Sequence, residues 1–319
     1  MISSGGQGTA GDGTRRPVDA RALARHAVRL TGRPAPWLHE EVARRMAERL
    51  GLLKQSPRHI VDWGARLGGS AEALRAACPQ ARFVAAEVWP AAADAAAEGQ
   101  PDSGAATAPW WSARRWWPAA AARPALPESA LPEGEADLLW SNMILHHQAA
   151  PQASMARWLR LLSVGGLLMF STLGPGSLAT LRRLYAAHGW PPPHAPFVDM
   201  HDVGDMLVQA GFADPVMDQE VLTLTWSTGD AALAELRQLG GNADPGRHAG
   251  LRTRHWRAAL ARALQAQGRP GDRVALEFEI VYGHAVRPPP RVRAGGETAV
   301  SLDEMRGMLR SGPRGDPTR

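Results

Sequence analysis

Short apolar runs alternate with helical stripes through the first half of the chain. The run RHIVDWG is typical of a buried strand, and SAEALRAAC, which begins with an N-cap serine, is typical of a helix. The same order of strand and helix returns further along. Strands are expected at 58–64, 81–87, 136–142 and 165–172, and helices between them at 70–78 and 151–162. Strands that alternate with helices predict a doubly wound, parallel α/β sheet.

Further elements flank this repeating unit. Apolar residues recur at helical spacing through 36–53, which predicts an amphipathic helix ahead of the first strand. After residue 172 we expect helices at about 177–188, 201–210, 230–239 and 254–266, and strands at 221–226 and 274–285. Because two strands follow the alternating units, they predict an antiparallel edge to the sheet. The Ala- and Pro-rich stretch 88–135 is expected to hold one irregular strand and a long loop.

Composition narrows the classes of function. The chain has 319 residues, of which 45% are hydrophobic, enough for one large domain. A net charge of +5, dispersed along the chain, argues against a dedicated nucleic-acid binder. The single cysteine, Cys78, excludes an intramolecular disulfide and a cysteine-only zinc site, and it favours the cytoplasm. We expect no membrane partner, because the longest apolar run, 165–170, is far too short to cross a bilayer, and the first residues do not resemble a signal peptide.

The first predicted strand ends in a glycine-rich turn, D-W-G-A-R-L-G-G, which begins at Asp62. Ligands of such sheets bind at the carboxyl ends of the strands, where Gly64 and Gly68 would let backbone amides approach them. The second strand ends about twenty residues later in Glu87, which can accept hydrogen bonds from both hydroxyls of a ribose. The spacing predicts a nucleoside site, and an ordinary strand-to-helix turn is the alternative.

The glycine turn and two longer segments resemble motifs of known families. The turn D-x-G-x-x-x-G resembles the first motif of class I S-adenosylmethionine (SAM) methyltransferases, D/E-x-G-x-G-x-G, with Arg66 in place of the middle glycine. More specifically, LLMFSTLGPGSLATLR (167–182) and FVDMHDVGDMLVQAGFADPVMDQEVLTLTW (197–226) resemble the malonyl-acyl-carrier-protein O-methyltransferases of biotin synthesis. The resemblance covers about residues 20–285.

This resemblance implies a fold, a cofactor and a site. The fold would be a mostly parallel, seven-stranded, Rossmann-like sheet with a late antiparallel strand and a helical insert. SAM would be the cofactor. Its binding residues would be Asp62, Gly64, Arg66, Gly68, Glu87, Asn142 and Leu145. The same strand end offers Asp137 and Ser141 as further candidates, although a buried strand with a polar end would look the same.

The resemblance also implies methyl transfer to the free carboxylate of a malonyl thioester on acyl carrier protein. Because a carboxylate is already ionised at neutral pH, the reaction needs no general base, but it needs a cation that binds this group. Arg182 or Arg183 is the candidate cation, with a solvated helix face as the alternative. Arg252, Arg254 and Arg257 are candidates for contact with the acidic carrier protein.

Several other side chains are assigned to structure. Met169, Phe170, Leu178 and Phe197 are expected in the core. The adjacent His146 and His147 should point to opposite faces of an extended segment, and no carboxylate or cysteine stands at ligand spacing from them. We therefore predict no metal site.

The resemblance sets the expected organisation of the chain. A single methyltransferase-like domain, 19–286, should lie between flexible tails at 1–18 and 287–319. Its parts would be a helical lead, a cofactor half, a substrate half with the insert, and a last strand, at 19–56, 57–172, 173–272 and 273–286.

Three departures from the family keep other functions open. The chain lacks the family's tyrosine near its start and has no clear acidic residue after the third strand, and Arg66 would place a positive charge beside a sulfonium. The alternatives are an inactive SAM-fold protein that acts as a binding partner, and a methyltransferase for another small carboxylic acid. Nucleic-acid modification ranks lower, because the chain has no N-P-P-Y or D-P-P-Y tetrapeptide that would hold a flipped base.

Overall fold

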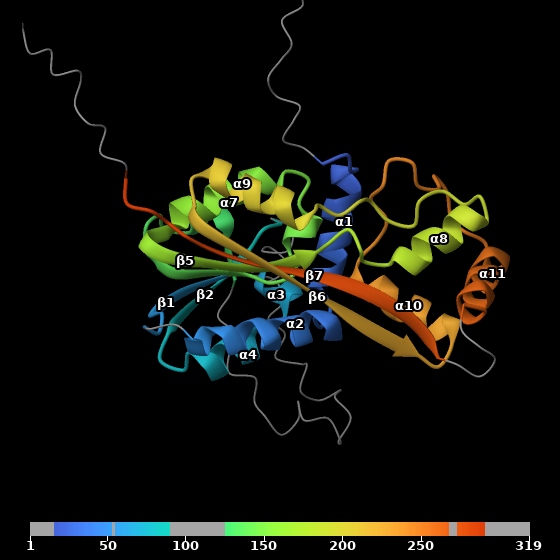
Figure 1. Ribbon diagram of the computed structural model, residues 1–319, viewed down its shortest axis with the longest axis horizontal. Coiled ribbons are helices and arrows are strands. Elements are labelled where there is room, and N and C mark those ends of the chain that lie inside the picture. Colours follow the sequence, from blue (N-terminus) through green and yellow to red (C-terminus); the bar gives the residue numbers. More distant parts are fainter. Residues whose placement is uncertain (1–15, 53–54, 90–124, 268–272, 291–319) are drawn as a thin grey trace, which may run out of the picture. The chain divides into compact units, whose positions relative to one another are not determined.

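Seven strands form a single sheet in the computed structural model, which describes residues 16–52, 55–89, 125–267 and 273–290 (Figure 1). The strands are β1 (His59–Trp63), β2 (Arg82–Glu87), β3 (Leu126–Pro127), β4 (Ala136–Ser141), β5 (Leu162–Leu173), β6 (Ala213–Trp226) and β7 (Val274–Val286). Their order is β3-β2-β1-β4-β5-β7-β6. The neighbours from β3 to β5 pair in parallel, whereas β7 runs antiparallel to both β5 and β6. The prediction of a mostly parallel, seven-stranded, doubly wound sheet is confirmed.

Helices cover both faces of this sheet (Figure 1). They are α1 (Ala20–Thr31), α2 (Trp37–Glu48), α3 (Ala65–Gly68), α4 (Ala71–Ala77), α7 (Pro151–Leu161), α8 (Ala179–Ala187), α9 (Met200–Ala210), α10 (Gly229–Leu239) and α11 (Arg254–Gln265), with the short 3-10 turns η1 (Arg49–Leu52), η2 (Glu128–Ala130) and η3 (Leu145–His147). One buried cluster joins α7 and α9 to the sheet, and another joins α2 and α4 to the opposite face. Helices α8, α10 and α11 gather beyond these layers, near one end of β6 and β7 (Figure 1).

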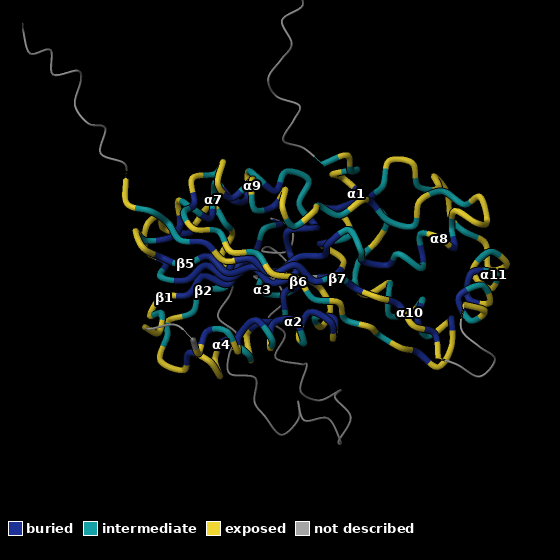
Figure 2. The backbone as a smooth tube through the Cα atoms, in the orientation of Figure 1, coloured by how far each residue is buried: buried dark blue, intermediate teal, exposed yellow. Residues whose placement is uncertain are grey.

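The two kinds of strand differ in burial for a physical reason. Strand β1 is buried from Ile60 onward, as a parallel strand covered on both faces must be (Figure 2). Strand β6 forms an edge, and its residues alternate between partly buried and exposed. Its first half, 213–220, is rich in polar residues, so the sequence predicted only the more apolar half, 221–226.

The expected N-cap of α4 has a different role. The Ser70 side chain makes no capping hydrogen bond. Instead its hydroxyl oxygen accepts a hydrogen bond from the indole Nε1 of the fully buried Trp140, at 2.8 Å. A buried indole N–H needs a partner, and that requirement takes the hydroxyl away from the helix end.

Two residues of the predicted N-terminal tail lie against the domain. The Arg16 amide donates to the Ala149 carbonyl at 3.0 Å, and Val18 packs against Leu23 and Ala243. The remainder of that tail, 1–15, lies outside the described residues, as do 291–319 of the C-terminal tail and 90–124 of the irregular stretch. In the described part of the chain, none of the helices has the length and apolar character that crossing a membrane requires.

Candidate functional site

The glycine turn after β1 is shaped by the segment that follows β4. Gly64 has a φ of +75°, which favours glycine, and a Cβ there would lie 2.6 Å from Ile144 Cδ1. Ile144 reaches this position directly after Met143, whose backbone is also left-handed, with a φ of +55°. At Gly68 a Cβ would lie 3.1 Å from the Asn142 carbonyl oxygen. The glycines thus let the turn after β1 and the segment after β4 pack closely against each other.

Glu87 stands where the ribose interpretation requires a carboxylate. It ends β2 and is only 1% exposed. One carboxylate oxygen, Oε1, accepts a hydrogen bond from the Arg66 amide at 3.1 Å, while Oε2 is buried and has no hydrogen-bond partner among the described residues. Burial raises the pKa of Glu87, and the Arg66 amide and charge partly oppose that rise. A ribose hydroxyl would satisfy the free oxygen.

The side chain of Arg66 lies beside that carboxylate. Its Nε is 4.0 Å from Glu87 Oε1, and the side chain is 36% exposed. The departure from the glycine motif therefore adds a cation that is paired with an acid and partly solvated. This placement weakens the objection that Arg66 would repel a sulfonium.

Asp62 is the second buried acid of the turn. It is the next-to-last residue of β1, and its Oδ1 has no hydrogen-bond partner among the described residues. Burial, reinforced by the negative charge of Glu87, raises the pKa of Asp62 to about 7. Two carboxylates with free, buried oxygens therefore stand at the carboxyl ends of β1 and β2.

Asn142 joins four parts of the site. Its amide nitrogen donates to the carbonyls of His39 at 2.8 Å and Gly68 at 2.6 Å, and its Oδ1 accepts from the Ser171 hydroxyl at 2.7 Å. Both amide hydrogens are thus used within the protein. Leu145 is buried in the cluster that contains α7 and α9. Contact of either side chain with a cofactor stays a prediction.

The other two candidates on β4 separate from each other. Ser141 ends the strand, and its hydroxyl is buried without a partner among the described residues. Asp137 lies near the start of the strand and accepts from the amides of Arg58 and His59, both at 3.0 Å. Because β1 and β4 are parallel, Asp137 stands at the edge of the sheet opposite the glycine turn, away from the site.

Three imidazoles lie beside the turn. The rings of His146 and His147 have centroids 4.2 Å apart, and His39 lies 6.4 Å from His146. We expected the adjacent pair to point to opposite faces, but they belong to the 3-10 turn η3, which places them side by side. Burial lowers the pKa of His39 to about 4 and that of His147 to about 3, and it also lowers the pKa of His146. All three are therefore neutral at pH 7.

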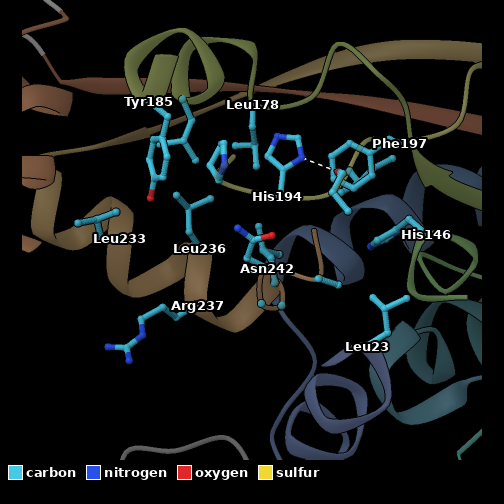
Figure 3. A pocket seen from close by; sticks show the side chains of 18 of the residues that line it. Leu23, His146, Leu178, Tyr185, His194, Phe197, Leu233, Leu236, Arg237 and Asn242 are labelled. Carbon is cyan, nitrogen blue, oxygen red and sulfur yellow. Dashed lines mark hydrogen bonds between the residues drawn. The ribbon is translucent and has the colours of Figure 1, made fainter. Parts of the chain in front are cut away.

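Beyond these imidazoles is a cavity of about 510 Å³ (Figure 3). Its walls come from α8, α10 and α11 and from the loops near 193–197 and 240–243. All four residues expected in the core belong to it or pack against it, and two of them, Leu178 and Phe197, also line this cavity. Tyr185 and Leu236 face each other across the space in Figure 3. Most of the wall is apolar.

Charged residues of one sign border this cavity. Among the described residues that line it are Arg16, Arg237, Arg252 and Arg257, and none is Asp or Glu. Arg182 and Arg183 are not in the lining. The helix positions Leu181 and Tyr185 face the cavity, and at 100° per residue Arg183 turns away from it, whereas Arg182 lies at the flank of this face. Together with burial, the charge of Arg182 lowers the pKa of His194 in the cavity wall. Arg183 is exposed and donates to Thr180 at 3.1 Å.

Comparison with known proteins decides the family. A family model described as a methyltransferase domain matches residues 37–214. The malonyl-acyl-carrier-protein O-methyltransferase of Laribacter hongkongensis (strain HLHK9) is 37% identical over 262 residues, which cover 81% of this chain and 86% of the relative. The chain belongs to this family. Enzymes of the same name from Gallionella capsiferriformans and Halorhodospira halophila are 36% and 34% identical, over 82% and 84% of this chain and 88% and 90% of their own lengths.

The protein is accordingly a SAM-dependent methyltransferase, and the alternative of an inactive SAM-fold protein is not favoured. The residues at its glycine turn fit this cofactor. The free oxygen of Glu87 can accept from a ribose hydroxyl, and the carboxylates of Glu87 and Asp62 suit a cofactor that carries a sulfonium.

Three residues beside the glycine turn or in the cavity wall were not singled out in the sequence. Ile144 follows the strand and has no polar atom, His39 lies within an apolar helical stripe, and Arg16 lies in a segment whose composition predicts a tail. Only the close approach of Ile144 to Gly64 had a local signal, because a glycine at the end of a strand indicates close packing.

Proposed function

We propose that this methyltransferase esterifies the free carboxylate of a malonyl thioester on acyl carrier protein, a cytoplasmic step of biotin synthesis. The names of the relatives support this substrate. The observation that carries the proposal is the charge of the cavity, because its described lining combines apolar walls with arginines and contains no acid. Such a lining suits an anionic group on an apolar or amphipathic arm.

The residues of the chain would bind the cofactor, align the carboxylate and exclude water. SAM, when bound, supplies a methyl group on a sulfonium, and Glu87 would hold its ribose. No described side chain has to remove a proton, because the attacking carboxylate is already ionised. Catalysis then depends on alignment of the carboxylate and on exclusion of water. The buried imidazoles and the leucine-lined wall would exclude water.

Docking of the carrier protein is a separate part of the proposal. Helix α11 and the residue pair before it carry Arg252, Arg254, Arg257 and Arg262, and 252–265 contains no acidic residue. Two of these arginines also line the cavity. An acidic carrier that docked on α11 would therefore present its thioester arm to the cavity, and the KM for the carrier should rise with salt.

Methyl transfer can be measured with the purified protein. We expect malonyl-acyl carrier protein plus SAM to give the methyl ester by mass spectrometry, and acetyl-acyl carrier protein, which has no free carboxylate, to give no product. The gene should also restore growth of a biotin-requiring strain that lacks this activity. Methylation of a different carboxylic acid, without complementation, would support the alternative substrate and overturn the proposal. Absence of calorimetric SAM binding at millimolar concentration would contradict the enzyme itself.

A further inference from the structure

Arg16 is a half-buried cation whose hydrogen-bond partners among the described residues are main-chain carbonyls. Its Nη1 donates to the main-chain carbonyls of His146 at 2.6 Å and Gln148 at 3.3 Å, and its Nη2 donates to that of Pro196 at 2.6 Å. No Asp or Glu among the described residues forms an ion pair with it. Burial lowers the pKa of Arg16 to about 10, so the guanidinium stays charged at neutral pH. A buried charge without a counter-charge is costly, and an anionic ligand would offset that cost.

The position of Arg16 distinguishes it from the other arginines of the cavity. It is held by η3 and Gln148, directly after the carboxyl end of β4, on the side of the cavity nearest the glycine turn. Arg257 forms an ion pair with Asp230 at 3.3 Å, and the Arg252 guanidinium lies 4.3 Å above the Trp256 ring. Arg237 is exposed, and its guanidinium points away from the labelled leucines of the wall (Figure 3).

The three carbonyls also leave donors free on the Arg16 guanidinium. A guanidinium has five N–H groups, and the contacts with His146, Gln148 and Pro196 use only the two terminal nitrogens. Within the described residues, Nε and one hydrogen of Nη2 are left without a partner and can donate to the oxygens of a carboxylate. The carbonyls hold the fork in place before a ligand arrives, which reduces the entropy lost on binding.

We propose that Arg16 binds the free carboxylate of the acyl substrate and makes the cavity select anionic over uncharged acyl groups. This assignment rests on the proposed function, and it replaces Arg182 and Arg183 as the substrate-binding cation. Arg16 acts by positioning the carboxylate oxygen and takes no part in proton transfer. Arg16 lies in the N-terminal segment, outside the α/β repeat, and its side chain contacts the loops after β4 and before α9. Specificity for the acyl group would therefore depend on this N-terminal segment.

Selectivity in binding tests the assignment. Calorimetric titration with malonyl-pantetheine and acetyl-pantetheine, with SAM in a parallel titration, measures each ligand separately. For the wild type we expect at least a tenfold preference for the malonyl probe. In Arg16→Gln the malonyl affinity should fall by tenfold or more, while the acetyl and SAM affinities change less than twofold. Arg16→Lys, which keeps the charge and loses the fork, should recover part of the preference.

A structural role for Arg16 would give a different pattern. The matched control is Arg247→Gln, which removes the 2.6 Å ion pair with Asp19 that ties the same N-terminal segment to the loop at 240–250. It should leave the malonyl preference intact. Equal losses for both probes in Arg16→Gln, or a wild type without a preference, would overturn the assignment. If the wild type selects the malonyl probe through Arg16 but does not methylate malonyl-acyl carrier protein, only the proposed substrate fails.

Discussion

The two ends of the site bury charged groups of opposite sign. At the glycine turn the buried groups are the carboxylates of Asp62 and Glu87, each with an oxygen free of hydrogen bonds within the described residues. At the cavity the partly buried charge is the Arg16 guanidinium, which lies beside the neutral rings of His146 and His147. Each end thus carries the charge opposite to its proposed ligand, because the sulfonium cofactor is cationic and the acyl carboxylate is anionic.

This contrast also explains two features that look unfavourable in isolation. Arg66 adds a cation at the acidic end, but it lies beside Glu87 and is partly solvated. The histidines add titratable bases between the ends, but burial keeps them neutral at pH 7, so they neither repel a sulfonium nor compete with Arg16 for a carboxylate.

The largest expected effect is on the pH dependence of stability through Asp62. Its pKa is about 7 in the folded protein and near 4 when unfolded, so the folded state binds the extra proton between these values. Stability from this group is therefore lost as pH rises toward 7. The wild type should lose about 2 to 3 kcal/mol of unfolding free energy from this group as pH rises from 5 to 8, and Asp62→Asn should not. The variant should therefore gain this amount relative to the wild type on going from pH 5 to pH 8.

Urea unfolding at both pH values measures this difference. The buried histidines act in the opposite direction, since their lowered pKa values favour the folded state as pH rises, but they are common to both proteins and cancel in the comparison. Asp205→Asn, at an exposed position of α9, is the matched control. A gain that is the same at pH 5 and pH 8 would show that Asp62 does not ionise in the folded protein between these pH values.

The next effect is on cofactor affinity through Glu87. Glu87→Gln preserves shape but removes the charge that strengthens hydrogen bonds to the ribose hydroxyls, so the Kd for SAM should rise about 10- to 100-fold. Calorimetric titration gives the value. Glu133→Gln removes an exposed carboxylate that pairs with Arg160 at 3.1 Å, and it should bind SAM as the wild type does. Unchanged affinity in Glu87→Gln would place the ribose elsewhere.

The smallest effect is expected from Arg66. Only its amide bonds to Glu87 within hydrogen-bond distance, and Arg66→Ala keeps that amide. The partly exposed guanidinium contributes little, so the Kd for SAM should change by less than about fivefold. A change beyond tenfold in the same titration would mean that the guanidinium contacts the cofactor, and the acidic end would then be mixed in charge.

Prediction from the sequence worked best for local patterns. The order of strands and helices, the glycine turn and the carboxylate at the end of β2 follow from periodicity and spacing, and the structure has them at nearly the predicted residues. The first half of β6 was not predicted, because this edge strand is partly exposed and its sequence is rich in polar residues. The N-cap role of Ser70 was not predicted correctly either, because its hydroxyl accepts a hydrogen bond from Trp140.

The sequence alone determined the family, the cofactor class and the acidic end of the site, because these depend on residues that are close in the chain or on long contiguous motifs. Only the tertiary structure decided which arginines line the cavity. Arg16 contacts a carbonyl 130 residues away, and Arg182, the last residue of the motif 167–182, is not among the residues that line the cavity. The direction of a side chain depends on helix phase and on loops that meet only in the folded protein, and neither is encoded in local spacing.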